Sequence, residues 1–159
     1  MPKIIKDGAV IEDSRASIDC ENSSPEQGQI CTLQQWQELT DKQGSAVQLE
    51  AGQEPAPLLA DLEKIELVVI NFSLFTDGRG FSYGRELRER GYSGELRATG
   101  HFIRDQLTYL GRCGFNSFEL PEGTDLYEAL NSLEDFSEHY QASIDSPQPL
   151  FRRRESVQV

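Results

Sequence analysis

A glycine-rich loop in the middle of the chain carries the residues best suited to binding chemistry. It reads Phe75-Thr-Asp-Gly-Arg-Gly-Phe-Ser-Tyr-Gly84 and follows the most apolar segment of the sequence. Gly78 and Gly80 permit positive φ angles, which would turn backbone amides toward an anion. A helix beginning at Ser82 would add its unpaired N–H groups and the positive end of its dipole. The pattern predicts an anion-binding loop, and a purely structural turn is the alternative.

Charged side chains extend this candidate site. Arg79 lies between the two glycines, where its guanidinium would clamp the same anion, and Asp77 would orient that guanidinium. Arg97 is expected near the carboxyl end of the next strand, with His101 just beyond it. Ligands of parallel sheets bind beyond the carboxyl ends of the strands. The predicted anion- or partner-binding set is therefore Asp77, Gly78, Arg79, Gly80, Ser82, Arg97, His101, Arg104 and Asp105.

No standard nucleotide or hydrolase motif is evident. The glycines of 78–84 are spaced G-x-G-x-x-x-G, one residue longer than the dinucleotide fingerprint, and Glu95 comes too early to bind its ribose. Walker A, G-x-S-x-G and H-E-x-x-H motifs are missing. Asp77, His101 and Asp105 would suit acid–base chemistry, although lone loop histidines are more often solvated. We assign neither a catalytic residue nor a cofactor.

The distribution of charge singles out the same region. The formal net charge is -12, which argues against nucleic acids and anionic membranes as partners. Within 77–120, however, seven arginines and no lysine face six acidic residues. An arginine-rich centre in an acidic chain suits a site for carboxylates or oxyanions. The structural alternative is pairing within a helix, because Arg85/Glu89 and Glu86/Arg90 are spaced i,i+4.

The three cysteines show no metal-binding spacing. Cys20, Cys31 and Cys113 are too few and too far apart for a self-contained cluster or zinc site, so no metal is predicted. Free thiols suit a reducing cytoplasm, and Cys113 is interpreted as a small buried residue at a helix end. The N-terminus has no signal-peptide pattern and no apolar run is long enough to span a membrane. A cytoplasmic location is expected.

The 159 residues predict one domain with four segments. A β-hairpin around Asp7-Gly8 is expected over 3–13, a polar loop over 14–29, an α/β core over 30–145 and an extended tail over 146–159. Thr32-Leu-Gln-Gln35 matches a capping box that opens a short helix.

Strands and helices alternate through the core. We predict strands over 46–50, 67–72, 95–99 and 117–120, and helices over 57–64, 82–90, 102–112 and 125–140, the last capped by Thr124. About four strand–helix units predict an α/β fold with an open parallel sheet. A half-barrel built from the same units is the alternative.

Several motifs in order resemble one bacterial family. They are the loop 75–82, Leu87-Arg-Glu-Arg90, Gly94-Glu-Leu-Arg-Ala98, Asp105-Gln106, Arg112-Cys-Gly-Phe115 and Pro149-Leu-Phe-Arg-Arg-Arg154. The chain is similar over about 30–154 to the family called domain of unknown function 934, which is associated with the sulfite reductase haemoprotein. That resemblance implies a role in sulfite reduction but supplies no catalytic residues.

Two hypotheses follow from the resemblance and the loop together. The first is an accessory protein of assimilatory sulfite reduction, which contacts sulfite reductase or a small oxyanion through 77–82 and Arg97. It predicts that Arg79→Ala leaves folding intact and abolishes the association. The second is an oxidoreductase with a non-standard flavin or nucleotide site in the same loop, lost in Gly80→Val.

Overall fold

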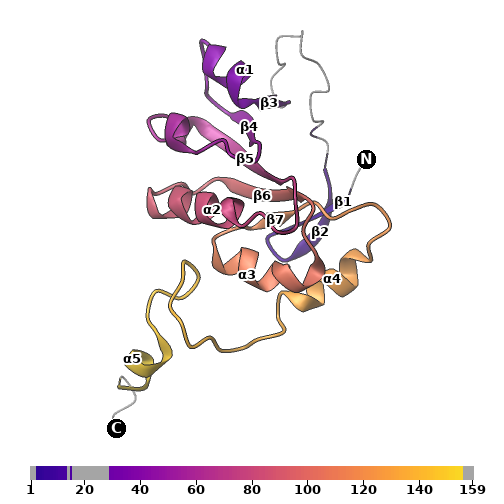
Figure 1. Cartoon of the computed structure of the whole chain (residues 1–159), viewed down its shortest axis with the longest axis vertical. Helices are drawn as coiled ribbons and strands as arrows, with labels where there is room; N and C mark the ends of the chain where they lie inside the picture. Colours follow the sequence, from indigo (N-terminus) through magenta and orange to yellow (C-terminus); the bar gives the residue numbers. More distant parts are fainter. Residues whose placement is uncertain (1–2, 14, 16–28, 156–159) are drawn as a thin grey trace.

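The computed structural model describes residues 3–13, 15 and 29–155, and its centre is one seven-stranded sheet (Figure 1). The strands are β1 (Lys3–Lys6), β2 (Ala9–Glu12), β3 (Ile30–Thr32), β4 (Ser45–Leu49), β5 (Ile65–Phe72), β6 (Glu95–Gly100) and β7 (Ser117–Phe118). Their order in the sheet is β2-β1-β7-β6-β5-β4-β3. Strands β3 to β7 are parallel, and the β1–β2 hairpin joins β7 in antiparallel pairing. The prediction of an open α/β sheet with an N-terminal hairpin is confirmed.

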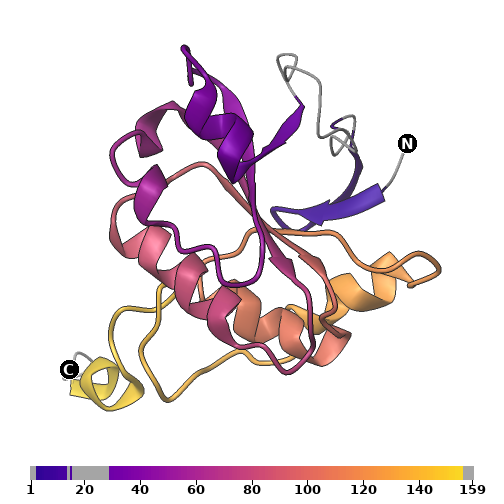
Figure 2. The same cartoon turned by 45° about the horizontal axis from the view of Figure 1, so that its top comes forward.

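Helices from most of the chain cover the same face of this sheet (Figure 2). The α-helices are α1 (Leu33–Glu38), α2 (Arg79–Glu89), α3 (Leu107–Arg112), α4 (Leu126–Ser132) and α5 (Leu150–Glu155), and the 3-10 helices are η1 (Ala56–Leu58), η2 (Leu62–Lys64) and η3 (Arg104–Gln106). One buried cluster contains Trp36 of α1, Leu87 of α2, Leu110 of α3 and Ala129 of α4. Helices α1 to α4 therefore share one core, as expected when parallel strands follow one another in sequence order.

Strand β5 lies at the centre of the parallel strands and is buried on both faces. Its side chains alternate between two clusters, with Val68 and Ile70 facing the helices and Leu67 and Val69 facing the opposite side. A strand that is covered on both sides needs an unbroken apolar run. This explains the composition of 67–72, and the predicted strand is confirmed and extended to Ile65.

The local signals at the N-terminus are also confirmed. Asp7 (φ 47°) and Gly8 (φ 77°) form the two-residue turn of the β1–β2 hairpin, the conformation that a primed turn requires. Thr32 caps α1 with the reciprocal bonds of a capping box, and Trp36 of that helix is fully buried. Of the predicted polar loop, residues 14 and 16–28 lie outside the described residues.

The predicted helix over 57–64 is wrong. This stretch forms η1 and η2, whose amides bond to the carbonyl three residues earlier, as Leu58 does to Pro55 and Lys64 does to Asp61. The two short turns meet near Asp61, whose carboxylate binds the ammonium groups of Lys42 and Lys64. These side-chain bonds hold a bend where a continuous helix was expected.

The predicted helices near the C-terminus have other bounds. Helix α4 is capped by Asp125 instead of Thr124 and ends at Ser132 instead of 140. The hydroxyl of Thr108 in α3 donates a hydrogen bond of 2.8 Å to the carbonyl of Ser132, the last residue of α4. The negative charge of Glu134 lies next to the negative end of the α4 dipole, which disfavours continuation of the helix. The segment 102–112 divides into η3 and α3, and the predicted extended tail contains α5.

Helix α2 contacts the sheet through two glycines one turn apart. It begins at Arg79, three residues earlier than predicted, so that Gly80 and Gly84 lie on its buried face. A Cβ atom on Gly80 would lie 2.6 Å from Cε1 of Phe72, and one on Gly84 would collide with the ring of Phe115. The rings of Phe72 and Phe115 lie 6.0 Å apart and fill the space that the glycines leave. The glycine spacing thus serves close packing of helix on strand.

Replacement of Gly84 by alanine is expected to destabilise the fold by about 1–3 kcal/mol, because the new methyl group would force the Phe115 ring to move. Equilibrium denaturation in urea measures this loss. Gly111→Ala in α3 is the matched control, since no atom lies within 4 Å of its Cβ position. That change is expected to stabilise by about 0.5–1 kcal/mol through helix propensity. Equal effects of the two substitutions would contradict the packing role of Gly84.

Candidate functional site

The loops that follow β4 to β7 form one rim of the sheet, which we call the carboxyl edge and define as residues 50–55, 73–79, 101–106 and 119–128. The parallel strands end there in register, with Phe72 of β5 opposite Gly100 of β6. The predicted site loop is its central part.

An ion pair dominates that central loop. Arg79 donates its backbone N–H to Oδ1 of Asp77 at 3.1 Å, its Nε to Oδ1 at 2.9 Å and its Nη2 to Oδ2 at 2.6 Å. The side-chain and backbone hydrogen bonds from Arg79 lower the pKa of Asp77 to about 2. Asp77 thus orients Arg79 as expected, and its carboxylate takes the position beside the guanidinium that an external anion was expected to take.

The glycines of this loop do not have the conformation that was predicted. Gly78 has φ −82° as the residue before α2, and Gly80 lies inside the helix without a positive φ. The expectation that both would turn amides toward an anion through positive φ is therefore wrong. Gly80 is needed instead for its contact with Phe72, and Ser82 is exposed in the second turn of α2.

A small hollow opens beside the ion pair. It is lined by Asp77, Arg79, Gly80 and by Glu50, Ala51, Ile70, Asn71, Phe72 and Tyr83, and its cavity volume of about 10 Å³ is close to that of one water molecule. Glu50 accepts a hydrogen bond of 2.6 Å from Nδ2 of Asn71. Glu50 and Asn71 were missed by sequence reasoning, although their positions at the ends of β4 and β5 could have indicated them.

The remaining predicted residues on the carboxyl edge lie in the loop after β6. His101 is exposed, and its backbone amide donates to the Phe72 carbonyl at 2.6 Å. Arg104 binds Glu128 and Ser132 of α4, so it fastens η3 to that helix. Asp105 is exposed in η3, in the first turn where its charge suits the helix dipole.

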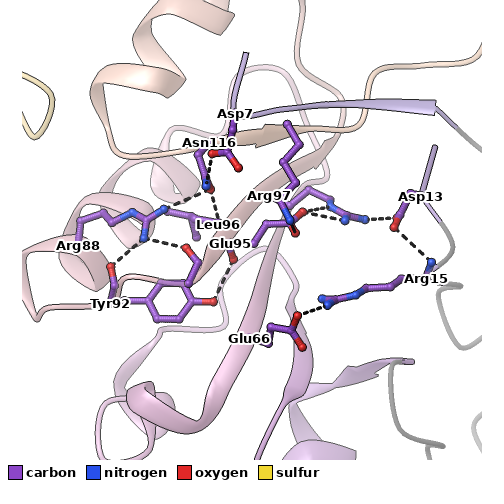
Figure 3. A network of polar contacts seen from close by, with 12 residues as sticks. Asp7, Asp13, Arg15, Glu66, Arg88, Tyr92, Glu95, Leu96, Arg97 and Asn116 are labelled. Atoms are coloured by element: carbon purple, nitrogen blue, oxygen red, sulfur yellow. Dashed lines mark hydrogen bonds and ion pairs between the residues drawn. The ribbon is translucent and has the colours of Figure 1, made fainter. Parts of the chain in front are cut away.

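Arg97 is not at the carboxyl edge. It occupies the third position of β6, is 2% exposed and faces away from the helices, so the predicted placement near the strand end is wrong (Figure 3). Its guanidinium donates to Asp13 at 2.6 Å and to Glu95 at 2.8 Å. Lys6 donates to the second oxygen of Glu95 at 2.7 Å. Burial would raise the pKa of Glu95, but the bonds from Lys6 and Arg97 outweigh it and lower that pKa.

Each of the seven arginines in 77–120 has an acceptor inside the chain. Arg85 and Arg90 pair with Glu89 and Glu86 as the i,i+4 spacing predicts. Arg88 donates to the carbonyls of Tyr92, Gly94 and Gly114 and to Asn116 (Figure 3). Arg79, Arg97 and Arg104 bind the acidic residues described above. Arg112 pairs with Asp145 and donates a hydrogen bond to the carbonyl of Gln141. Most of the arginine-rich centre therefore connects elements of the fold.

Exposed apolar side chains are the feature of the carboxyl edge that sequence reasoning missed. Leu74 and Phe75 are 63% and 53% exposed, directly after the most buried strand. Ile103 and Tyr127 are exposed in the next two loops. A pair of large apolar residues after a buried strand was visible in the sequence, but its exposure depends on where the loop turns away from the core.

Two of the three cysteines, Cys31 and Cys113, lie in the part of the chain that the structure describes, and neither forms a disulfide. Cys31 and Cys113 are buried, and burial raises the pKa of both. Cys113 directly follows α3 as its C-cap residue, which confirms its interpretation as a small buried residue at a helix end. Within 3–13, 15 and 29–155, no group of three histidine, cysteine or acidic residues is arranged to hold a metal ion.

Comparison with known proteins places the chain in a family. The family described as "Bacterial protein of unknown function (DUF934)" matches residues 46–151, about two-thirds of the sequence. The chain belongs to this family. The match contains β4 from its second residue, strands β5 to β7 and all of the carboxyl edge. No curated protein and no solved structure matches the chain. None of the described helices has the length and apolar character needed to cross a membrane.

The Asp77 carboxyl group is expected to titrate near pH 2 in the folded chain, well below the usual value of about 3.9. The depressed pKa means that this pair stabilises the fold above about pH 4 and loses its contribution as the pH falls toward 2. Carbon-detected NMR titration measures the midpoint. Arg79→Ala should return it toward the usual value, whereas Arg85→Ala should not change it; an unshifted midpoint in wild type would disprove the pair.

Removal of Arg97 is expected to cost about 3–5 kcal/mol of unfolding free energy, because Arg97→Met leaves Asp13 and Glu95 buried without their main cation. Chemical denaturation gives the value. The control is Arg85→Met, which removes an exposed pair and should cost less than about 1 kcal/mol. A small effect at Arg97 would show that the network is not energetically important.

Proposed function

We propose that this chain is an accessory protein of assimilatory sulfite reduction that binds the sulfite reductase haemoprotein through the carboxyl edge. The resemblance of its ordered motifs to a family associated with that haemoprotein supports the choice of partner. The observation that carries the binding role is the exposure of Leu74 and Phe75 beside the Asp77–Arg79 pair. Adjacent large apolar side chains that remain exposed are typical of a protein-binding surface.

The geometry of the central loop favours surface binding over a small-ligand pocket. The hollow beside Arg79 has room for about one water molecule. The ring of Phe72 fills the space next to Gly80, where a nucleotide site would need open access to the backbone. These features support docking of a protein more than binding of a flavin or nucleotide.

Association with the haemoprotein is the first test. The chain would be co-expressed with sulfite reductase, purified by a tag on the reductase and analysed by size-exclusion chromatography, with a visible absorbance spectrum of the chain alone. We expect co-elution and a colourless chain. Separate elution would overturn the accessory role, and a stoichiometric flavin or haem spectrum in the chain alone would favour the oxidoreductase alternative.

A charge placed in the apolar surface is expected to prevent the complex. Phe75→Asp should weaken binding at least about tenfold, because a central aromatic contact would be replaced by a solvated charge. Phe151→Asp is the matched control, since Phe151 is 52% exposed and lies on α5, away from the carboxyl edge. Isothermal titration calorimetry compares the two variants. Unaltered affinity of Phe75→Asp, with its fold intact by circular dichroism, would contradict the assigned surface.

A further inference from the structure

Exposed apolar side chains gather in three successive loops of the carboxyl edge. Leu74 and Phe75 follow β5, Ile103 follows β6, and Tyr127, 68% exposed, lies in the first turn of α4 after β7. The three strands are neighbours, and the bond of Arg104 to Glu128 joins the last two loops. Single exposed apolar residues are normal on a protein surface, but four in adjacent loops form a candidate contact surface.

The charge around these apolar residues is strongly negative. The carboxyl edge holds eight acidic and two basic residues, a formal net charge of −6 and half of that of the whole chain. Both cations are already neutralised, Arg79 by Asp77 and Arg104 by Glu128. In the part of the chain that the structure describes, no cation pairs with the other six acids, which are Glu50, Glu54, Asp105, Glu119, Glu122 and Asp125.

We propose that the carboxyl edge binds a basic protein surface, in which lysine or arginine side chains surround an apolar contact. This inference rests on the docking role proposed above and names the chemistry of the partner. Acids around apolar residues suit cationic side chains, whose methylene stems pack on Phe75 and Tyr127 while their charged ends reach the carboxylates.

Charge complementarity also excludes the other occupants of this edge. A second copy of the chain would bring a net charge of -12 and an equally acidic edge. Nucleic acids and anionic lipid surfaces would be repelled in the same way. A free oxyanion at Arg79 would meet a guanidinium whose Nε and Nη2 already bind Asp77, and it would lie close to the negative charge of Glu50, which lines the same hollow.

Two synthetic peptides test the sign of the charge without any assumption about the partner. One is an amphipathic helix of leucine and lysine, and the other has glutamate in place of each lysine. Titrations of the isotope-labelled chain by NMR should show binding of the basic peptide alone, with shifts centred on the carboxyl edge and lost at high salt. Binding of the acidic peptide, or equal shifts over the whole surface, would overturn the inference.

Charge-reversal variants locate the contact. The double variant Asp105→Lys/Glu122→Lys should weaken the basic peptide about tenfold at low salt, because both residues are exposed in loops of the edge. Glu38→Lys/Glu63→Lys is the matched control, because it makes the same change in net charge at exposed positions outside the carboxyl edge, at the end of α1 and in η2 before β5. Equal weakening by both pairs would mean attraction to net charge alone and would disprove a specific site.

Substitution of Arg79 and titration with sulfite distinguish a site for a basic partner from a site for an anion. Arg79→Ala should raise the affinity for the basic peptide, because it removes one of the two cations of the carboxyl edge and leaves the Asp77 carboxylate unpaired. Sodium sulfite or sulfate should not shift the loop amides. Saturable binding of either anion, abolished by Arg79→Ala, would overturn the basic-partner inference. These peptide and anion measurements do not depend on sulfite reductase. If the chain fails to co-elute with the haemoprotein, the proposed function is wrong, but binding of the basic peptide at the carboxyl edge would still support a basic partner.

Discussion

The close contact between α2 and the sheet determines the position of the central loop of the carboxyl edge. Gly80 and Gly84 let the helix approach until the rings of Phe72 and Phe115 fill the space beneath it. A side chain at either position would push the helix outward and move the loop before it. Because that loop is short and ends in the Asp77–Arg79 pair, its exposed apolar residues depend on this single packing contact.

The arrangement of strands places the loops of the carboxyl edge next to one another. In doubly wound sheets the ligand crevice forms where the strand order reverses. Here β3 to β7 follow one another without reversal, and helices α1 to α4 pack on one face. Successive loops therefore lie side by side along the rim, and this is the arrangement on which the proposed docking surface depends.

Arginine has a mainly architectural role in this chain. Arg88 joins three backbone carbonyls and Asn116, Arg97 joins β6 to Asp13 after the hairpin, and Arg104 joins η3 to α4. A planar guanidinium with several donors suits each of these tasks better than an ammonium group. These guanidinium groups are thus bound to acceptors within the chain, and the loops of the carboxyl edge keep an excess of negative charge.

Local signals in the sequence determined the hairpin at Asp7-Gly8, the capping box at Thr32, the buried strand and the alternation of strands and helices, because each depends on backbone preference or on the pattern of apolar residues. Tertiary structure alone decided where α4 ends, which face Arg97 takes and which acid binds Arg104. Those outcomes depend on contacts between distant residues or on the exact path of a loop, and composition cannot express them. The acidic character of the carboxyl edge is of this second kind, since its acids come from four separate segments of the chain that only the order of strands in the sheet brings to one rim.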